Sequence, residues 1–270
     1  MASKEWNEVD SKQYQFENYY CVFLDILGYK DKLARFFRGE YNLYGRVQRA
    51  MSDAGVNTLD SPDGIKTRIF SDSIILTAPE KVEIGLLINY TAAIVARFSY
   101  EGLFLRGGIS AGRLLENDAD GFSFLASEGL VNAHKKETEA TYPMIVIDTT
   151  LVSKIDKKYI VKFREGHSEC KCILNYAWYV INKSAENEGV VISELKDIGG
   201  MIVKLGGDVN NSTNLTNENE RVRQKYKWIW ILSYYLWFIE MCNKNNALFD
   251  MDKFLQFDKE RDDRFIFMSI

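Results

Sequence analysis

The pattern of apolar and polar positions divides the chain into alternating predicted strands and helices. Residues 19–27 form an almost continuous apolar run that ends at Gly28, which is typical of a buried strand. Residues 67–77 predict two short strands joined by a polar turn at 71–73. The other predicted elements are one or two helices in 29–55 with a break near Gly39, a helix in 81–100, a strand in 104–112, a hairpin through 116–121, a helix in 127–139 and a strand in 144–148.

The remaining residues predict an extension of the same sheet and a long helix. Strands are expected near 159–163 and 170–180, a polar loop at 209–220, and an aromatic helix at 221–244. This order of elements favours an α+β fold with helices packed against one sheet, and it fits neither a Rossmann nor a barrel order. Only three prolines occur and no Gly- or Pro-rich linker divides the chain, so one compact unit is expected.

Composition and charge narrow the classes of function. The 270 residues are 46% hydrophobic, which is enough for a substantial core, and the formal net charge of −4 is unlike that of a protein that coats nucleic acid. The longest apolar stretch, 228–241, contains Glu240 and is shorter than the roughly 20 residues that span a bilayer. The N-terminus has no apolar signal run, and the four cysteines are too scattered for a disulfide scaffold. We therefore expect a cytoplasmic protein that neither binds nucleic acid nor inserts into a membrane.

Two acidic residues indicate a metal site. Asp25 lies on the first predicted strand among apolar neighbours, where a carboxylate must be paired, protonated or bound to a cation. Asp72 lies in the turn between two apolar strands, so both acids converge if these strands are neighbours. Two carboxylates in a chain with only two histidines favour Mg²⁺ or Mn²⁺ over zinc, and such ions bridge triphosphate oxygens. In the alternative reading, Asp25 caps the following helix and Asp72 is an ordinary turn acid.

Four segments of the sequence resemble the motifs of a known family. In order, they read FLDILGY at 23–29, IFSDS at 69–73, LRGGISAG at 105–112 and LVNA at 130–133. They resemble, respectively, the first metal-binding strand, the hairpin with the second metal acid, the R-x-G-I-x-x-G strand and the Asn-bearing helix start of class III adenylate and guanylate cyclases. The first three, with YPMIVID at 142–148, are more similar still to the bacterial pyrimidine cyclases of Pycsar anti-phage defence.

The resemblance, which covers residues 18–150, implies a fold and an assembly. The fold is α+β and class III nucleotidyl cyclase-like, with a ferredoxin-like βαββαβ core. We expect a disordered lead-in at 1–15, a cyclase catalytic domain at 16–182, and a mainly helical C-terminal extension at 183–270 packed on the core. The family also implies a homodimer with composite active sites, in which one subunit supplies the metal acids and the other the base-reading residues.

The resemblance also implies roles for individual residues. Asp25, Ile26 and Asp72 would bind two Mn²⁺ or Mg²⁺ ions per site. Asn132 would be catalytic, and Lys136 stands where the family has its transition-state arginine. Lysine keeps the positive charge but lacks the bidentate fork of arginine.

Base choice depends on two further positions. Arg68 stands four residues before the second metal acid, where adenylate cyclases carry Lys and guanylate cyclases Glu. Arginine offers only donors, which suit the two carbonyls of uracil, whereas cytosine has one carbonyl and a ring nitrogen that accepts. The second purine-selecting position falls near Leu125, which has no polar group. UTP is therefore preferred over CTP as the substrate. In the alternative reading, Arg68 is a surface residue of a strand and does not contact the base. Ser71 replaces the glycine that usually precedes the second metal acid.

Together these residues predict a metal-dependent pyrimidine nucleotide cyclase. It would convert UTP to 3′,5′-cyclic UMP and pyrophosphate, as a second messenger for a downstream effector in bacterial anti-phage defence. Two alternatives stay open: a cytidylate cyclase that makes cyclic CMP, and a catalytically silent cyclase-like domain that binds nucleotide as a sensor. Retention of both Asp25 and Asp72 favours the enzyme, because a silent domain has no need for two buried acids.

Overall fold

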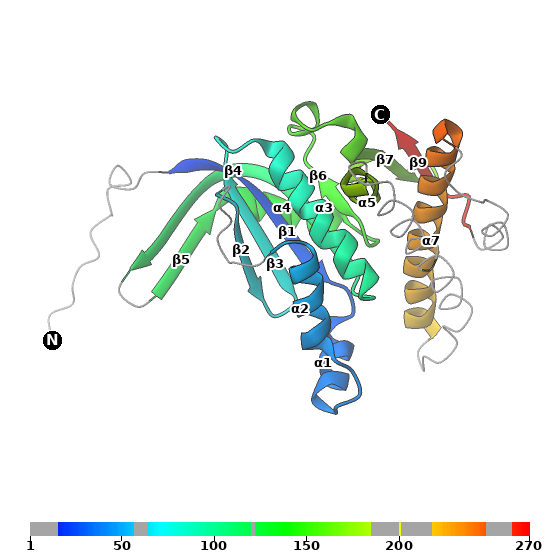
Figure 1. Ribbon diagram of the computed structural model, residues 1–270, viewed down its shortest axis with the longest axis horizontal. Coiled ribbons are helices and arrows are strands. Elements are labelled where there is room, and N and C mark those ends of the chain that lie inside the picture. The colour runs from blue at the N-terminus through cyan, green and yellow to red at the C-terminus, as the bar shows by residue number, and fades with distance from the viewer. Residues whose placement is uncertain (1–15, 57–63, 120–121, 185–199, 201–217, 247–260) are drawn as a thin grey trace, which may run out of the picture.

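The computed structural model describes residues 16–56, 64–119, 122–184, 200, 218–246 and 261–270 (Figure 1). Its strands are β1 (Glu17–Ile26), β2 (Lys66–Phe70), β3 (Ser73–Pro79), β4 (Leu105–Ala119), β5 (Phe122–Ser127), β6 (Ile145–Ile147), β7 (Ile160–Glu165), β8 (Lys171–Leu174) and β9 (Phe265–Ser269). Its helices are α1 (Tyr29–Phe37), α2 (Leu43–Asp53), α3 (Ile84–Tyr100), α4 (Glu128–Glu139), α5 (Ala177–Ser184) and α7 (Glu218–Asn246). The strands and helices expected before residue 150 are all present.

The first four strands form a ferredoxin-like core. They lie side by side in the order β2, β3, β1 and β4, and β1 is antiparallel to both of its neighbours. The chain reaches β2 through α1 and α2, and reaches β4 through α3, so two split β-α-β units interleave in one sheet. This is the βαββαβ arrangement, and the predicted α+β class is confirmed.

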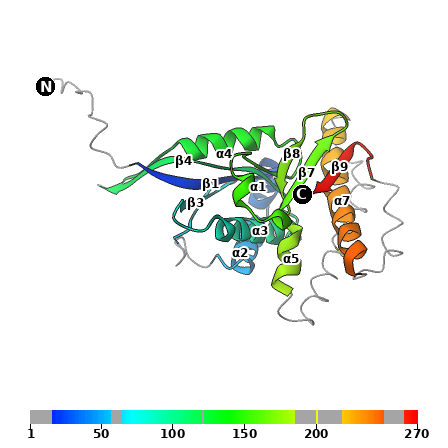
Figure 2. The same cartoon turned by 90° about the horizontal axis from the view of Figure 1, so that it is seen from above.

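Alternate residues of β1 face two different layers. Tyr20, Val22 and Leu24 are buried in the main apolar core, which α2 and α3 also line. Cys21 lies on the opposite face, where it is buried against Ala133 of α4. Figure 2 shows α4 on one side of the sheet and α2 and α3 on the other. Because α4 packs mainly on β1, β4 and β6, the same face of β2 and β3 has no helix over it within the described residues.

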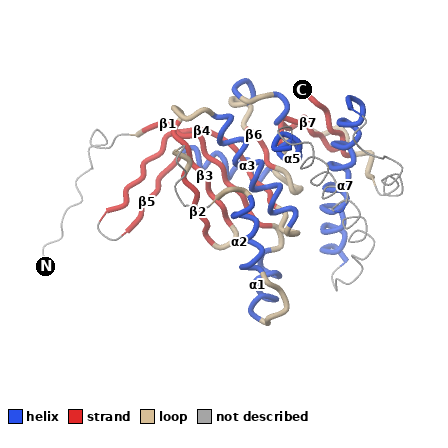
Figure 3. The backbone as a smooth tube through the Cα atoms, in the orientation of Figure 1, coloured by secondary structure: helices blue, strands red, loops and turns tan. Residues whose placement is uncertain are grey.

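The sheet continues beyond β4 through β6, β8, β7 and β9. Strand β6 is parallel to β4, and the later pairs are antiparallel. Helix α7 presents Trp230, which is fully buried against Tyr142, Phe163 and Phe267. Strand β9 thus joins the same sheet as the N-terminal strands, and α7 packs beside it. The expected domain boundary after residue 182 falls inside α5 and stays a prediction. The backbone tube in Figure 3 shows the same strands beside α7.

One predicted strand was too long. The strand expected at 170–180 ends at Leu174, and α5 begins at Ala177. The N–H of Asn175 still donates to the carbonyl oxygen of Tyr159 at 2.8 Å, in the register of the β7–β8 ladder, and the chain turns into α5 directly afterwards. The apolar aromatic run that follows fits a strand or a helix equally well in sequence, and packing against α3 and α7 decides for the helix.

Two expectations fall largely outside the described residues. They are the lead-in at 1–15 and the polar loop at 209–220, of which only residues 218–220 are described, as the start of α7. None of the described helices combines the length and the apolar character that a bilayer crossing requires.

Gly108 allows α4 to approach β4 closely. A Cβ at this position would lie 2.1 Å from the carbonyl oxygen of Ala133 and 2.4 Å from the Cβ of Lys136. We expect Gly108→Ala to lower the free energy of unfolding by about 1–3 kcal/mol, because the methyl group must push α4 away from the sheet. Gly85→Ala in the first turn of α3 is the matched control, and its Cβ would meet only ordinary contacts. Urea unfolding measures both variants, and an unchanged midpoint for Gly108→Ala would contradict this packing.

Candidate active site at one end of the sheet

Asp25 and Asp72 converge at one end of the sheet. Asp25 is paired in register with Ser73, the first residue of β3. Asp72 precedes Ser73 in the β2–β3 turn, and its carbonyl oxygen accepts the N–H of Ile26 at 2.9 Å. The alternative reading of Asp25 as a helix cap is wrong, because the N-cap of α1 is Gly28. The metal-binding role of the two acids stays a prediction.

The turn that carries Asp72 has an unusual backbone conformation at Ser71. With φ at 57°, Ser71 is the one non-glycine residue in the described part of the chain with a positive φ. A side chain in this left-handed region costs about 1–2 kcal/mol, which glycine does not incur. The glycine that is usual at this position in the resembling family therefore suits the same turn. Ser71 thus adopts a strained backbone conformation in the turn that carries Asp72.

Arg106 lies between Asp25 and a second carboxylate, Glu137 of α4. Its Nε is 3.3 Å from Oδ2 of Asp25 and 2.6 Å from Oε1 of Glu137. The side chain of Glu137 is only 4% exposed, so its charged form needs a neighbouring cation. Arg106 therefore links α4 to the end of β1 and balances two acids at once.

Burial raises the pKa of Asp25 above its ordinary value. The Arg106 guanidinium opposes this shift, while the negative charges of Asp72 and Glu137 add to it. These acids carry more charge than one guanidinium balances, so the arrangement favours a further cation near Asp25.

Two lysines bring positive charge to the same place. Burial and the positive charge of Arg106 lower the pKa of Lys227 on α7, and the negative charge of Asp25 opposes this shift. Burial is the main cause that lowers the pKa of Lys32 on α1. The charge of Asp31 opposes this shift, and the charge of Lys227 adds to it. Arg106 of β4 and Lys227 of α7 thus bring positive charge to the acidic end of the sheet, and Nζ of Lys32 donates to the carbonyl oxygen of Leu27, just after β1, at 2.7 Å. Such a combination suits a polyphosphate that arrives with a divalent cation.

The donor atoms suit Mg²⁺ or Mn²⁺. Asp25 and Asp72 supply carboxylate oxygens, whereas Ile26 has a buried apolar side chain, so its main chain alone offers a ligand. Within the described ranges, no three His, Cys, Asp or Glu side chains form a self-sufficient metal site. Mg²⁺ commonly takes one or two protein carboxylates and completes its shell with water and substrate phosphates. The residues present therefore fit an ion that binds together with a nucleotide.

Asn132 and Lys136 lie on α4, and Lys136 does not turn toward Asp25. Its Nζ is 2.9 Å from Oε1 of Glu139. The next residue, Glu137, contacts Arg106 instead. Asn132 is half-buried one turn earlier on the helix. The structure thus places the two expected catalytic residues on α4, and in this chain Lys136 pairs with Glu139 and not with the acids of β1 and the β2–β3 turn.

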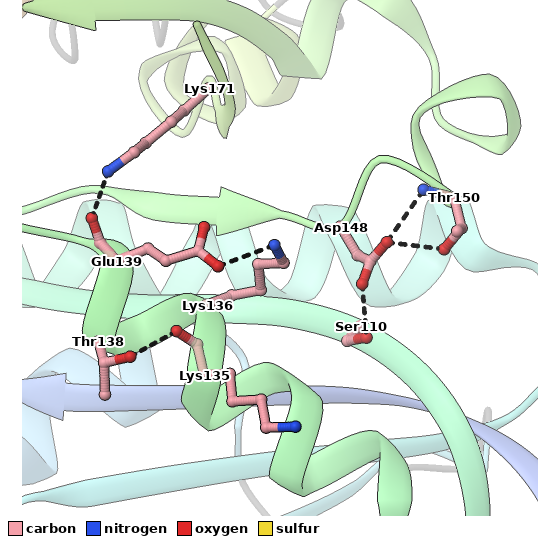
Figure 4. Close-up of polar contacts among 8 residues, drawn as sticks. All are labelled: Ser110, Lys135, Lys136, Thr138, Glu139, Asp148, Thr150 and Lys171. Atoms are coloured by element: carbon pink, nitrogen blue, oxygen red, sulfur yellow. Dashed lines mark hydrogen bonds and ion pairs between the residues drawn. The ribbon is translucent and has the colours of Figure 1, made fainter. Parts of the chain in front are cut away.

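A polar network fixes the surroundings of Lys136 (Figure 4). Asp148 accepts hydrogen bonds from the hydroxyls of Ser110 at 3.1 Å and Thr150 at 2.8 Å. Burial alone would raise the pKa of Asp148, but the main-chain N–H of Thr150, the two hydroxyls and the charge of Lys136 lower it overall. Asp148 therefore stays charged and balances the lysine from the β6 side. Lys171 donates to the carbonyl oxygen of Glu139 at 2.5 Å, where a cation suits the helix C-terminus.

Arg68 is engaged by another side chain. It forms an ion pair with Glu116 of β4, and Lys66 contacts the same carboxylate at 2.8 Å. Leu125 of β5 lies directly opposite Glu116 in register. The two positions expected to read the base therefore lie around one carboxylate. Arg68 is only 19% exposed, so it is not a simple surface residue.

Several charged residues of these clusters, among them Glu137, Glu116 and Lys227, were not predicted as site residues from the sequence. Glu137 lies four residues after the buried Ala133, and an acid on the buried side of a helix is a signal that a cation lies opposite. Glu116 and Lys227 carry no such signal. Their partners lie far away in the sequence and meet them through the bend of the β4–β5 hairpin and the return of α7.

Comparisons with known proteins give only distant similarity. Neither a protein-family model nor a curated protein matches the sequence. Among solved structures, the adenylyl cyclase CyaB from P. aeruginosa is 13% identical, with a TM-score of 0.44 over 59% of this chain and 94% of that one. The guanylyl cyclase Cya2 is 10% identical, with a TM-score of 0.41 over 60% and 92% of the two chains. A class III adenylyl cyclase-like ATP-binding protein from Pseudomonas aeruginosa is 11% identical, with a TM-score of 0.41 over 56% and 38%. Likeness at this level establishes neither a family nor an activity.

We expect Asp25→Asn to raise the thermal midpoint at neutral pH. The pKa of Asp25 is raised on folding, so its charged form costs stability above the folded pKa. The advantage of the variant should shrink as the pH falls and vanish below the pKa of the unfolded chain, where Asp25 is protonated in both states. Thermal unfolding from about pH 3 to about pH 8 measures this difference. The exposed Asp263→Asn is the control, and a less stable Asp25→Asn at neutral pH would mark the acid as structural.

Proposed function

We propose that this chain is a class III nucleotide cyclase that converts UTP to 3′,5′-cyclic UMP and pyrophosphate. The observation that carries the proposal is the convergence of Asp25 and Asp72 beside Arg106, with Lys227 of α7 near enough for its charge to interact with those of Asp25 and Arg106. The reaction is an in-line attack of the ribose 3′-hydroxyl on the α-phosphate, with pyrophosphate as the leaving group. It needs carboxylates for divalent ions and cations for phosphates at one place.

Each residue of the cluster has a distinct task in this reaction. Two Mg²⁺ or Mn²⁺ ions held by Asp25, Ile26 and Asp72 would activate the hydroxyl and neutralise phosphate charge. Arg106 remains anchored by Glu137 while Asp25 turns to a cation, so its guanidinium stays available for phosphate oxygens. The strained turn at Ser71 and the pairing of β1 with β3 hold the two acids at a fixed spacing.

The placement of α4 supports a homodimer with composite sites. Lys136 pairs with Glu139 within its own chain, so we propose that Asn132 and Lys136 act on the nucleotide from the other subunit. Phe70 at the end of β2 is 60% exposed and Val131 on α4 is 55% exposed, and large apolar side chains of this kind are typical of a surface that a second copy covers.

A cytidylate cyclase is the second candidate. The carboxylate of Glu116 next to Arg68 adds an acceptor to a site that otherwise offers donors, and such an acceptor also suits the amine of cytosine. The role of the cyclic nucleotide as a cytoplasmic second messenger in anti-phage defence is part of the same proposal and rests on the resemblance of the sequence motifs.

We expect cyclic UMP to form from UTP when the purified protein is incubated with each of the four nucleoside triphosphates and Mn²⁺. Asp72→Asn should lower turnover on the order of a hundredfold or more, because the metal supplies several kcal/mol of transition-state stabilisation. Mass spectrometry of the product and pyrophosphate release measure the reaction, with Asp263→Asn as the control. Cyclic CMP as the main product would select the second candidate. Nucleotide binding without any cyclic product would instead indicate a sensor domain.

The composite site predicts complementation between two inactive variants. Asp25→Asn loses a metal acid and Arg68→Ala loses a base-reading residue, so a mixed dimer has one site with both defects and one intact site. Statistical exchange should restore about a quarter of the wild-type sites. A mixture of Asp25→Asn with Asp72→Asn is the control and should show no rescue, because both defects affect the same half of each site. Equal activities of the two mixtures after demonstrated subunit exchange would argue against a shared site.

A further inference from the structure

We propose that Glu116 reads the base: its carboxylate accepts the N3–H of uracil while the adjacent Arg68 donates to a neighbouring carbonyl. This inference rests on the proposed nucleotide cyclase and names a specificity-determining residue for its substrate. It concerns the end of β4 opposite to Arg106, where the β4–β5 hairpin meets β2.

Glu116 joins parts of the chain that are distant in sequence. Its carboxylate forms an ion pair with Arg68 through Oε1 and with Lys66 through Oε2, the latter at 2.8 Å. Both partners lie on β2, and Leu125 is opposite Glu116 on β5. The β4–β5 hairpin therefore bends until its carboxylate reaches the edge strand of the sheet.

The pair of Glu116 and Arg68 is largely shielded from water. The side chain of Glu116 is 12% exposed and that of Arg68 is 19% exposed, whereas Lys66 is 40% exposed. Ion pairs that solvent reaches contribute little, while hydrogen bonds of a shielded charged pair to a ligand are stronger. The ion pair of the more exposed Lys66 is therefore the weaker of the two, and the shielded pair of Glu116 and Arg68 is the one that a polar ligand would engage.

The pair retains hydrogen-bonding capacity for a ligand. Nη1 of Arg68 is buried and has no hydrogen-bond partner among the described residues. A carboxylate oxygen accepts more than one hydrogen bond, so Glu116 can receive another donor while it holds Arg68. A buried donor without a partner costs free energy, which a bound polar ligand would recover.

The edge of uracil matches this combination. Its N3–H is a donor that lies between two carbonyl acceptors, so one carboxylate and one guanidinium side by side satisfy two adjacent groups of the base. Leu125 has no polar group, so the charged pair supplies the polar contacts here. Methylation of uracil at N3 removes the donor that Glu116 would accept and keeps both carbonyls.

The test compares the binding of UTP and 3-methyl-UTP to the full-length protein by calorimetry, with Ca²⁺ in place of Mn²⁺ so that turnover does not intervene. Wild-type protein should bind UTP about tenfold or more tightly than 3-methyl-UTP, because a charged hydrogen bond is lost. In Glu116→Met this ratio should fall to near one, and in Glu116→Gln, which keeps an acceptor, to an intermediate value. Lys66→Met, which removes the exposed ion pair on the same carboxylate, should keep the wild-type ratio.

Each outcome bears on Glu116 separately from catalysis. A structural role would weaken both ligands equally, so an unchanged ratio in Glu116→Met overturns the proposal. If Glu116→Met does not fold, a wild-type ratio in Glu116→Gln overturns it equally. Loss of CTP affinity in the Glu116 variants with UTP affinity preserved would also overturn the N3–H assignment. Absence of cyclic product from wild-type protein, with the UTP ratio as expected, would refute the cyclase and leave Glu116 as a base-reading residue of a sensor.

Discussion

The guanidinium of Arg106 stands between a carboxylate at the end of β1 and a buried carboxylate on α4. This contact joins a carboxylate that is only 4% exposed to a cation, and it connects α4 to the end of the sheet where Asp25 and Asp72 meet. The close approach of α4 to β4 at Gly108 is a second part of the same constraint. Without a cation at Arg106, two partly buried acids would face each other and the helix that carries Asn132 would lose its anchor.

Strand β4 organises both halves of the candidate site. Near its start Arg106 contacts the acids, and near its end Glu116 contacts Arg68. The strand extends past the end of β1 and pairs with β5, so a single element carries both charged clusters. The face between these clusters has no helix over β2 and β3 in the described chain.

Several elements were readable from the sequence because their signals are local. The apolar run before Gly28, the polar turn between two short strands and the helical spacing in 81–100 each depend on residues close together in the chain. The strand expected at 170–180 failed for the opposite reason. Its aromatic residues suit a strand or a helix, and contacts with α3 and α7 select the helix. Likewise, the expectation for the base-reading site considered the hydrogen-bond donors of Arg68 alone. The partner of Arg68, Glu116, lies 48 residues further along the chain and was not considered.

The sequence by itself determined the order of the βαββαβ core, the two acids that meet at its end and the motifs that suggest a nucleotide, because strand and turn patterns depend on residues close in the chain. The tertiary structure decided which charges balance those acids. Glu137 approaches from α4, Lys227 from α7 and Glu116 from the bent hairpin, and each faces a residue whose distance in sequence gives no hint of contact. Electrostatic partners act through space and depend on burial, so the fold must bring them together before their charges have meaning.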